Sequence, residues 1–117
     1  MTKAIRIFVV FEGITFAAAA LTHFGVLMNG YEHRQAGIAE SVIATVLFVG
    51  LILTLILHGA TRGIALAVQG FALLGTLVGI VTIAIGIGPR TIPDITYHIA
   101  IVIVLVWGLV TTWRARQ

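Results

Sequence analysis

Cysteine is absent from the 117 residues of the chain. Its absence excludes disulfides, thiolate metal sites, iron–sulfur clusters and thioether-linked haem. Any metal site must therefore use histidine, carboxylate or methionine ligands.

Charged residues are scarce as well. They make up 9% of the sequence, whereas hydrophobic residues make up 60%; soluble domains carry about 25% charged residues. So few charges cannot cover a surface that faces water, and we therefore expect the lipid bilayer to be the main partner. A basic stripe and an aromatic platform are also lacking, so nucleic acid is not an expected partner.

Four long apolar runs fill almost the whole sequence. They cover residues 4–28, 36–57, 63–87 and 94–114. Each run reaches the length of about 20 residues that a helix needs to cross the hydrocarbon core, and none alternates with the period of a membrane strand. The first run is too long for a signal peptide and contains Glu12. We predict a single all-α domain, residues 1–117, with four transmembrane helices.

The links between these runs are short and contain turn-forming pairs such as Asn29-Gly30 and Gly88-Pro89. Short links place consecutive helices antiparallel, which predicts an up-down four-helix bundle. Basic residues are more numerous on one side of the predicted bundle than on the other. The first side has Lys3, Arg6, Arg62, Arg114 and Arg116, and the second has Arg34 and Arg90. The positive-inside rule then predicts cytoplasmic termini, in a bacterial or archaeal plasma membrane.

The two halves of the chain show a weak similarity. When the first pair of runs is aligned with the second, Glu12 falls on Gln69 and Glu40 falls on His98. This pattern suggests a duplicated helical hairpin, with the two halves related by an axis along the membrane normal.

Ionisable side chains inside apolar runs are costly in a bilayer, so each one is a candidate functional residue. His23, Glu40, Asp94 and His98 all fall near the same end of the expected bundle. Asp94 and His98 are four residues apart and therefore share a helix face. We expect these side chains to point inward and form one cluster.

Histidine and carboxylate groups on facing helices are ligands for zinc, copper and iron. We therefore hypothesise a transition-metal site with four ligands: His23, Glu40, His98 and Asp94. Two histidines on different helices are also able to bind haem b axially, with His23 and His98 as the cofactor-binding residues. The alternatives are a purely structural polar cluster and a proton or ion pathway.

Separate predictions concern the polar and small residues outside this cluster. Glu12 and Gln69 lie at a similar depth in the expected bundle, and we therefore predict that they form an intramembrane polar pair. Gly75 and Gly79 form a small-xxx-small pattern, which fits either packing inside the bundle or a homo-oligomer contact. His33, in the first link, is interpreted as a solvated loop residue.

The sequence contains no hydrolase elbow, phosphate loop or dinucleotide fingerprint, and it identifies no catalytic residue. Besides metal or haem binding, two other functions fit the pattern. One is a non-catalytic accessory or assembly subunit of a larger membrane complex. The other is a small proton- or ion-conducting transporter.

Overall fold

The computed structural model describes residues 2–115, and all regular structure in that range is helical. Its elements are α1 (Thr2–His23), α2 (Arg34–Ile56), the short 3-10 turn η1 (His58–Ala60), α3 (Thr61–Ala84) and α4 (Ile92–Arg114). The four α-helices are all long and apolar enough to cross a membrane. The prediction of four such helices and no strands is therefore confirmed for residues 2–115.

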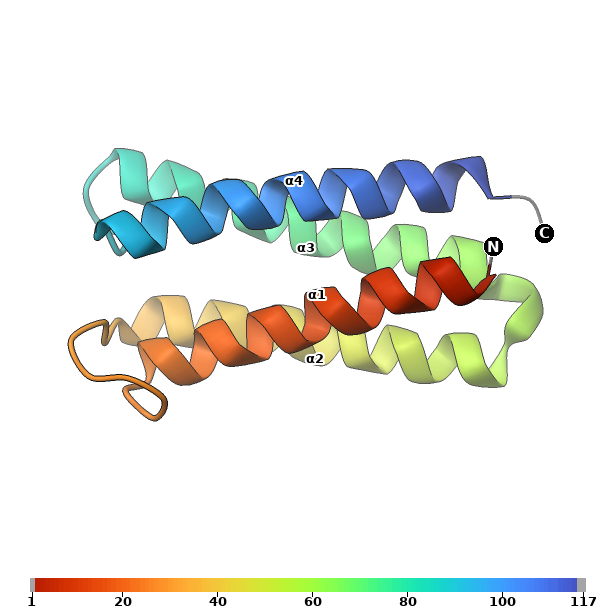
Figure 1. The fold of residues 1–117 in the computed structure, drawn as a ribbon, viewed down its shortest axis with the longest axis horizontal. Coiled ribbons are helices and arrows are strands. Elements are labelled where there is room, and N and C mark those ends of the chain that lie inside the picture. The colour runs from red at the N-terminus through yellow and green to blue at the C-terminus, as the bar shows by residue number, and fades with distance from the viewer. Residues whose placement is uncertain (1, 116–117) are drawn as a thin grey trace.

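The helices lie along the long axis of a body that measures 44 × 24 × 16 Å. Figure 1 shows that consecutive helices run in opposite directions, so that the start of α1 and the end of α4 lie at the same end. α1 and α3 approach each other across the bundle, whereas α2 and α4 do not. Space for a cavity is therefore left between α2 and α4.

The surface has the opposite character to that of a soluble bundle, and the interior combines an apolar core with many polar side chains. Large apolar side chains point outward on every helix, among them Phe11, Ile52, Val81 and Ile103. The buried polar side chains are Glu12, His23, Glu40, Thr54, Thr61, Gln69, Thr76, Asp94, His98 and Thr112. Soluble domains place few such groups inside. This distribution fits a surface that meets lipid.

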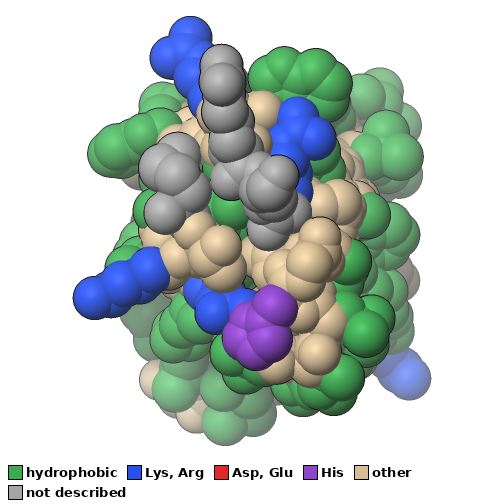
Figure 2. Space-filling model, turned by 90° about the vertical axis from the view of Figure 1, so that its right-hand side faces the viewer, with side chains coloured by type: hydrophobic (Ala, Val, Ile, Leu, Met, Phe, Trp, Pro, Cys, Tyr) green, Lys and Arg blue, Asp and Glu red, His purple; other side chains and the backbone are tan. Residues whose placement is uncertain are grey.

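Two arginines bind carbonyl groups at the C-terminal ends of neighbouring helices. An Nη2 of Arg6 donates to the carbonyl of Thr54 at 2.7 Å, and an Nη2 of Arg62 donates to the carbonyl of Trp113 at 2.8 Å. A positive charge is favourable at a helix C-terminus. Figure 2 looks onto this end of the bundle, where Lys and Arg side chains gather and no acidic side chain is visible.

Two helices end earlier than the apolar runs predict. α1 ends at His23 because Gly25 adopts the left-handed conformation, with φ 78°, and the chain turns back there. α3 ends at Ala84, two residues before Gly86 with φ 91°. Glycine in this conformation commonly terminates helices. Apolar character therefore continues past the helix ends, and hydropathy alone overestimates their length.

Gly50 marks a tight approach between α2 and α3. A Cβ atom added at Gly50 would lie 2.6 and 2.9 Å from the two Cγ atoms of Val68, and a β-branched side chain has little freedom to move away. We expect Gly50→Ala to lower the free energy of unfolding by about 1–3 kcal/mol. Thermal unfolding in detergent, followed by circular dichroism, measures the change.

Gly70→Ala is the matched control, because a Cβ at Gly70 meets no atom within 4 Å. In an open helical position, alanine should stabilise the protein by about 0.5–1 kcal/mol. Equal effects of the two substitutions would contradict the packing of α2 on α3 at Gly50.

Candidate functional site

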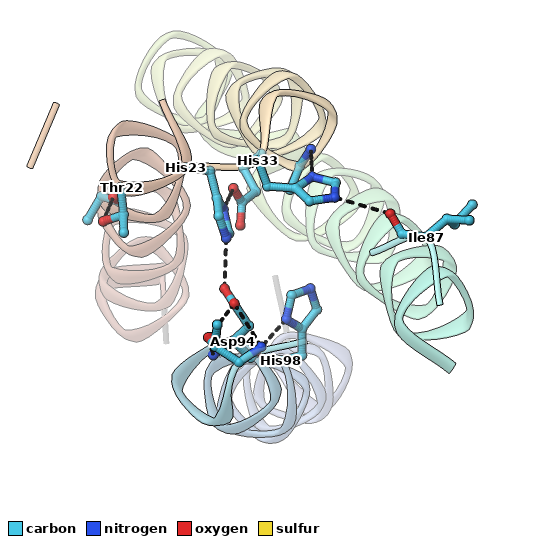
Figure 3. A network of polar contacts seen from close by, with 10 residues as sticks. Thr22, His23, His33, Ile87, Asp94 and His98 are labelled. Carbon is cyan, nitrogen blue, oxygen red and sulfur yellow. Dashed lines mark hydrogen bonds and ion pairs between the residues drawn. The ribbon is translucent and has the colours of Figure 1, made fainter. Parts of the chain in front are cut away.

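His23 lies between two carboxylates that come from different helices. Its Nδ1 is 2.5 Å from Oε1 of Glu40 on α2, and its Nε2 is 2.8 Å from Oδ1 of Asp94 on α4. All three side chains are buried. Figure 3 shows His23 and Asp94 facing each other across the space between the helices. We call His23, Glu40 and Asp94 the triad.

The two contacts of His23 set a minimum number of protons in the triad. An ionised carboxylate only accepts hydrogen bonds, so each contact needs a proton on either the ring nitrogen or the carboxyl group. A neutral imidazole has a single N–H, and one further proton is therefore required. With this proton alone the triad carries a single negative charge, and a further proton on Oε2 of Glu40 would make it neutral without breaking either contact.

Asp94 is well supplied with hydrogen-bond donors. Its Oδ2 accepts hydrogen bonds from the backbone N–H and the hydroxyl of Thr91, while its own N–H donates to Oγ1 of Thr91. These contacts form a capping box at the start of α4. The N-terminus of a helix also favours negative charge. Asp94 is therefore satisfied as an anion by its own helix.

Glu40 is satisfied on one side only. Its Oε1 contacts His23, but its Oε2 is buried and has no hydrogen-bond partner in the described part of the chain. The uncompensated acceptor of the triad is thus Oε2 of Glu40.

A cavity of about 350 Å³ lies between α2, α3 and α4, next to Glu40. Its walls include Phe16, Ile43, Val78 and Ile87, together with Glu40, Thr76, Tyr97 and His98. The Tyr97 hydroxyl is buried and, like Oε2 of Glu40, lacks a partner among residues 2–115. Small-molecule sites have volumes of about 300–1,000 Å³ and combine apolar walls with a few polar groups. The cavity has this size and composition.

A second, more open cavity of about 470 Å³ lies between α1 and α4. Ala18 and Thr22 line it, together with His23, Asp94 and Tyr97. The triad therefore separates two cavities: Glu40 lines the first, and the other two members line the second.

His98 contacts the backbone of its own helix and not the carboxylate of Asp94. Its Nδ1 is 2.7 Å from the carbonyl oxygen of Asp94. A carbonyl only accepts, so Nδ1 carries the proton and, in the neutral ring, Nε2 keeps a lone pair. Figure 3 shows the ring of His98 pointing into the space between the helices. His98 therefore presents a hydrogen-bond acceptor to the cavity that it lines.

His33 has a structural role that the sequence analysis misses. It is the N-cap of α2, where its Nδ1 accepts a hydrogen bond from the N–H of Ala36 at 3.2 Å. Its Nε2 donates to the carbonyl of Ile87 at 3.1 Å and so ties together two links of the bundle. Histidine is an uncommon N-cap, so capping patterns do not flag it.

The neighbouring Glu32 is an exposed member of the same link. Its carboxylate accepts hydrogen bonds from its own backbone N–H and from that of Gly30, and these bonds lower the pKa of Glu32. A carboxylate held in this way helps to fix the turn between α1 and α2.

Glu12 and Gln69 lie far along the bundle from the triad and face the same point on α4. A Cβ atom added at Gly108 would lie 2.7 Å from Oε2 of Glu12 and 2.3 Å from Oε1 of Gln69. The Nε2 of Gln69 donates to Oγ1 of Thr112 at 2.8 Å. Both Glu12 oxygens and Oε1 of Gln69 are buried without a partner among residues 2–115. A protonated Glu12 would supply the missing donor.

The structure thus brings Glu12 and Gln69 to the same point on α4 without a hydrogen bond between them, so the polar pair stays a prediction, and it adds two residues to this group. Gly108 provides the space for the two side chains, and Thr112 receives the amide of Gln69. Glycine in a helix is common and carries no signal of its own, so contacts between helices are needed to see its role.

Gly75 and Gly79 face neighbouring helices within the bundle. A Cβ at Gly75 would lie 2.9 Å from Cδ1 of Ile43 on α2, and one at Gly79 would lie 3.3 Å from Nε2 of His98 on α4. These contacts fit the interpretation of the motif as internal packing. A homo-oligomer contact stays a prediction.

Residues 2–115 contain no group of three or more His, Asp or Glu residues arranged to hold a metal ion. Both ring nitrogens of His23 already contact carboxylates, and a histidine ligand needs a free lone pair on one nitrogen. Of the two histidines proposed to bind haem or metal, only His98 keeps one. The metal and haem hypotheses therefore gain no support from the geometry.

Comparison with known proteins does not assign the chain to a family: no family model, curated protein or solved structure matches it. The fold and the site define its class directly. It is an all-helical chain with four helices long and apolar enough to span a membrane, in which a buried triad of one histidine and two carboxylates lies between two cavities.

Proposed function

We propose that the chain is an integral membrane protein that binds a small, membrane-soluble molecule in the cavity between α2, α3 and α4. Its apolar outward faces support membrane insertion. Basic residues at the end that carries both termini support a cytoplasmic location for that end, with the triad toward the opposite side.

The observation that carries the binding proposal is that two residues lining the cavity, Glu40 and Tyr97, each hold a buried polar atom without a partner among residues 2–115. These atoms are Oε2 of Glu40 and the hydroxyl oxygen of Tyr97. Burying such groups is unfavourable unless they form hydrogen bonds. A ligand with an apolar body and a polar head would satisfy them and would fill the apolar part of the cavity.

Ala39→Trp should weaken ligand binding about tenfold or more, a change equivalent to about 1.4 kcal/mol. Ala39 lines the cavity, so an indole at this position occupies the volume that the ligand needs. The probe is a medium-chain alcohol that bears a photoreactive diazirine, applied to the protein in phosphatidylcholine nanodiscs. Mass spectrometry then maps and quantifies the labelled residues.

Ala18→Trp is the matched control, because Ala18 is also exposed on its helix but lines the second cavity. This variant should retain saturable labelling of cavity residues such as Val78 and Ile87. If labelling is not saturable, or if the two variants behave alike, the proposed binding function is wrong.

Metal or haem binding remains a prediction without a supporting contact, for the reasons given above. The accessory-subunit and transporter hypotheses likewise remain predictions. The small-molecule proposal is preferred because it accounts for both unsatisfied polar groups, which belong to residues that line a single cavity.

A further inference from the structure

We infer that the molecule bound in this cavity is a lipophilic alcohol whose uncharged hydroxyl group donates a hydrogen bond to Nε2 of His98. This inference rests on the proposed binding function and specifies the head group of the ligand. Three observations lead to it: an accessible acceptor on His98, the opening that Gly79 leaves beside that acceptor, and the commitment of nearby hydrogen-bond donors to backbone carbonyls.

The accessible acceptor is the first observation. Nδ1 of His98 donates to the carbonyl of Asp94 at 2.7 Å, which leaves the lone pair of the neutral ring on Nε2. Nε2 has no hydrogen-bond partner among residues 2–115, yet it is not one of the fully enclosed unpartnered atoms of that range. It therefore keeps accessible surface, unlike Oε2 of Glu40 and the hydroxyl of Tyr97. His98 lines this cavity and not the second one, so a ligand here reaches Nε2 without rearranging the wall.

Gly79 on α3 leaves Nε2 uncovered. A Cβ atom added at Gly79 would lie 3.3 Å from Nε2 and 3.6 Å from Cδ2 of His98. Hydrogen-bond donors approach a nitrogen or oxygen acceptor at about 2.7–3.2 Å, so a methyl group at Gly79 would take the place of a donor. Gly79 also lines the cavity. The missing side chain therefore opens the lone pair of His98 to the cavity.

The donors of the wall are largely committed to the backbone. The hydroxyls of Thr76 and Thr82 donate to carbonyls of the preceding turn of α3, at 2.7 and 2.6 Å. Nε2 of His33 donates to a carbonyl in the link after α3 at 3.1 Å. The amide of Gln35 is the exception, on an exposed residue in the first turn of α2. A ligand that brings its own donor therefore suits this wall better than one that only accepts.

The lining favours an uncharged head and an apolar body. A buried charge needs a charged or strongly hydrogen-bonding partner, and the Asp, Glu, Lys and Arg residues that line the cavity amount to Glu40, whose Oε2 is enclosed. A hydroxyl has a single donor, which one acceptor satisfies. Ile43, Val78 and Ile87 provide apolar surface for a hydrocarbon chain. A lipophilic alcohol combines these features.

Competition against the photoreactive alcohol tests the inference on the intact protein in phosphatidylcholine nanodiscs. Decanol and its isomer nonyl methyl ether contain the same atoms, but only decanol has an O–H donor. We expect decanol to compete about five- to tenfold better, with both concentrations expressed per lipid to remove differences in partitioning. The ratio of the two competing concentrations is the measured quantity.

Substitutions beside Nε2 identify the acceptor. Gly79→Ala should reduce the ratio to about one, because the methyl covers Nε2 while His98 stays in place. Gly75→Ala is the matched control: it adds the same methyl to the wall of the same cavity, but 2.9 Å from Cδ1 of Ile43. This variant should keep the wild-type ratio. His98→Phe retains a ring without nitrogen atoms and should also bring the ratio to about one.

The outcomes separate the inference from the function on which it rests. If the two isomers compete equally in wild type while Ala39→Trp still blocks labelling, the cavity binds ligands but the assignment of a hydroxyl head is overturned. If decanol competes better and the ratio is unchanged in Gly79→Ala and His98→Phe, or if Gly75→Ala lowers it as much as Gly79→Ala, Nε2 is not the acceptor and the inference is also overturned. If labelling is insensitive to Ala39→Trp, the proposed function itself fails.

Discussion

Replacing His23 with alanine should lower the free energy of unfolding by about 3–5 kcal/mol, the usual result of removing one partner from a buried ion pair. Glu40 and Asp94 are each only 6% exposed. Without the ring, Oε1 of Glu40 and Oδ1 of Asp94 lose their shared donor. Two buried carboxyl groups then face a cavity that water must fill. Thermal unfolding in detergent measures the loss.

A second substitution identifies the cause of that loss. If the damage comes from the stranded carboxylates, Glu40→Gln should be less harmful in the His23→Ala protein than in wild type, because the two residues contact each other. His58→Ala controls for removal of a histidine in general, since His58 is exposed in η1, the turn between α2 and α3, where its ring contacts the Arg6 side chain. We expect it to change stability by less than about 1 kcal/mol. An equal effect at His23 and His58 would refute the role assigned to the triad.

The sequence is sufficient to predict the helices but not their exact ends. Long apolar runs report where a chain avoids water, and this determines the number of helices. They do not report backbone conformation, so the predicted first helix includes the apolar residues between His23 and Met28. The left-handed Gly25 ends that helix earlier. As a result His23 is the last residue of α1, where its ring reaches both α2 and α4.

The sequence predicts which side chains of the site lie at the same depth in the bundle, but it does not predict which of them are in contact. Counting residues along each helix places His23, Glu40, Asp94 and His98 at one level. Which of them touch depends on the rotation of each helix about its axis. His23 contacts both carboxylates, whereas His98, one turn after Asp94, donates to a carbonyl of its own helix.

The cavity is a property of the assembled bundle and has no signature in the sequence. It lies where α2 and α4 stay apart while α1 and α3 approach each other. How closely two helices approach also depends on small side chains at particular crossings, such as Gly50 of α2 against Val68 of α3. Single-helix patterns do not reveal which glycines lie at a crossing, because glycine is frequent in membrane helices generally.

Gly108→Ala should be among the most harmful small substitutions in the chain, with a loss of about 3 kcal/mol in the free energy of unfolding. The added methyl would lie 2.3 Å from Oε1 of Gln69 and 2.7 Å from Oε2 of Glu12. Overpacking a core costs about 1–3 kcal/mol. Displacing the amide of Gln69 also endangers its hydrogen bond to Thr112, and an unsatisfied buried group adds about 1–3 kcal/mol.

The origin of this loss is testable by making room for the methyl group. In the Gly108→Ala protein, Gln69→Ala removes the side chain that the methyl would meet first. The double variant should therefore be more stable than the sum of the two single effects predicts. Gly70→Ala again serves as the control, because a Cβ there meets no atom within 4 Å. If Gly108→Ala unfolds at the temperature of Gly70→Ala, then Glu12 and Gln69 do not converge on α4, and the interior of the bundle at that level must be arranged differently.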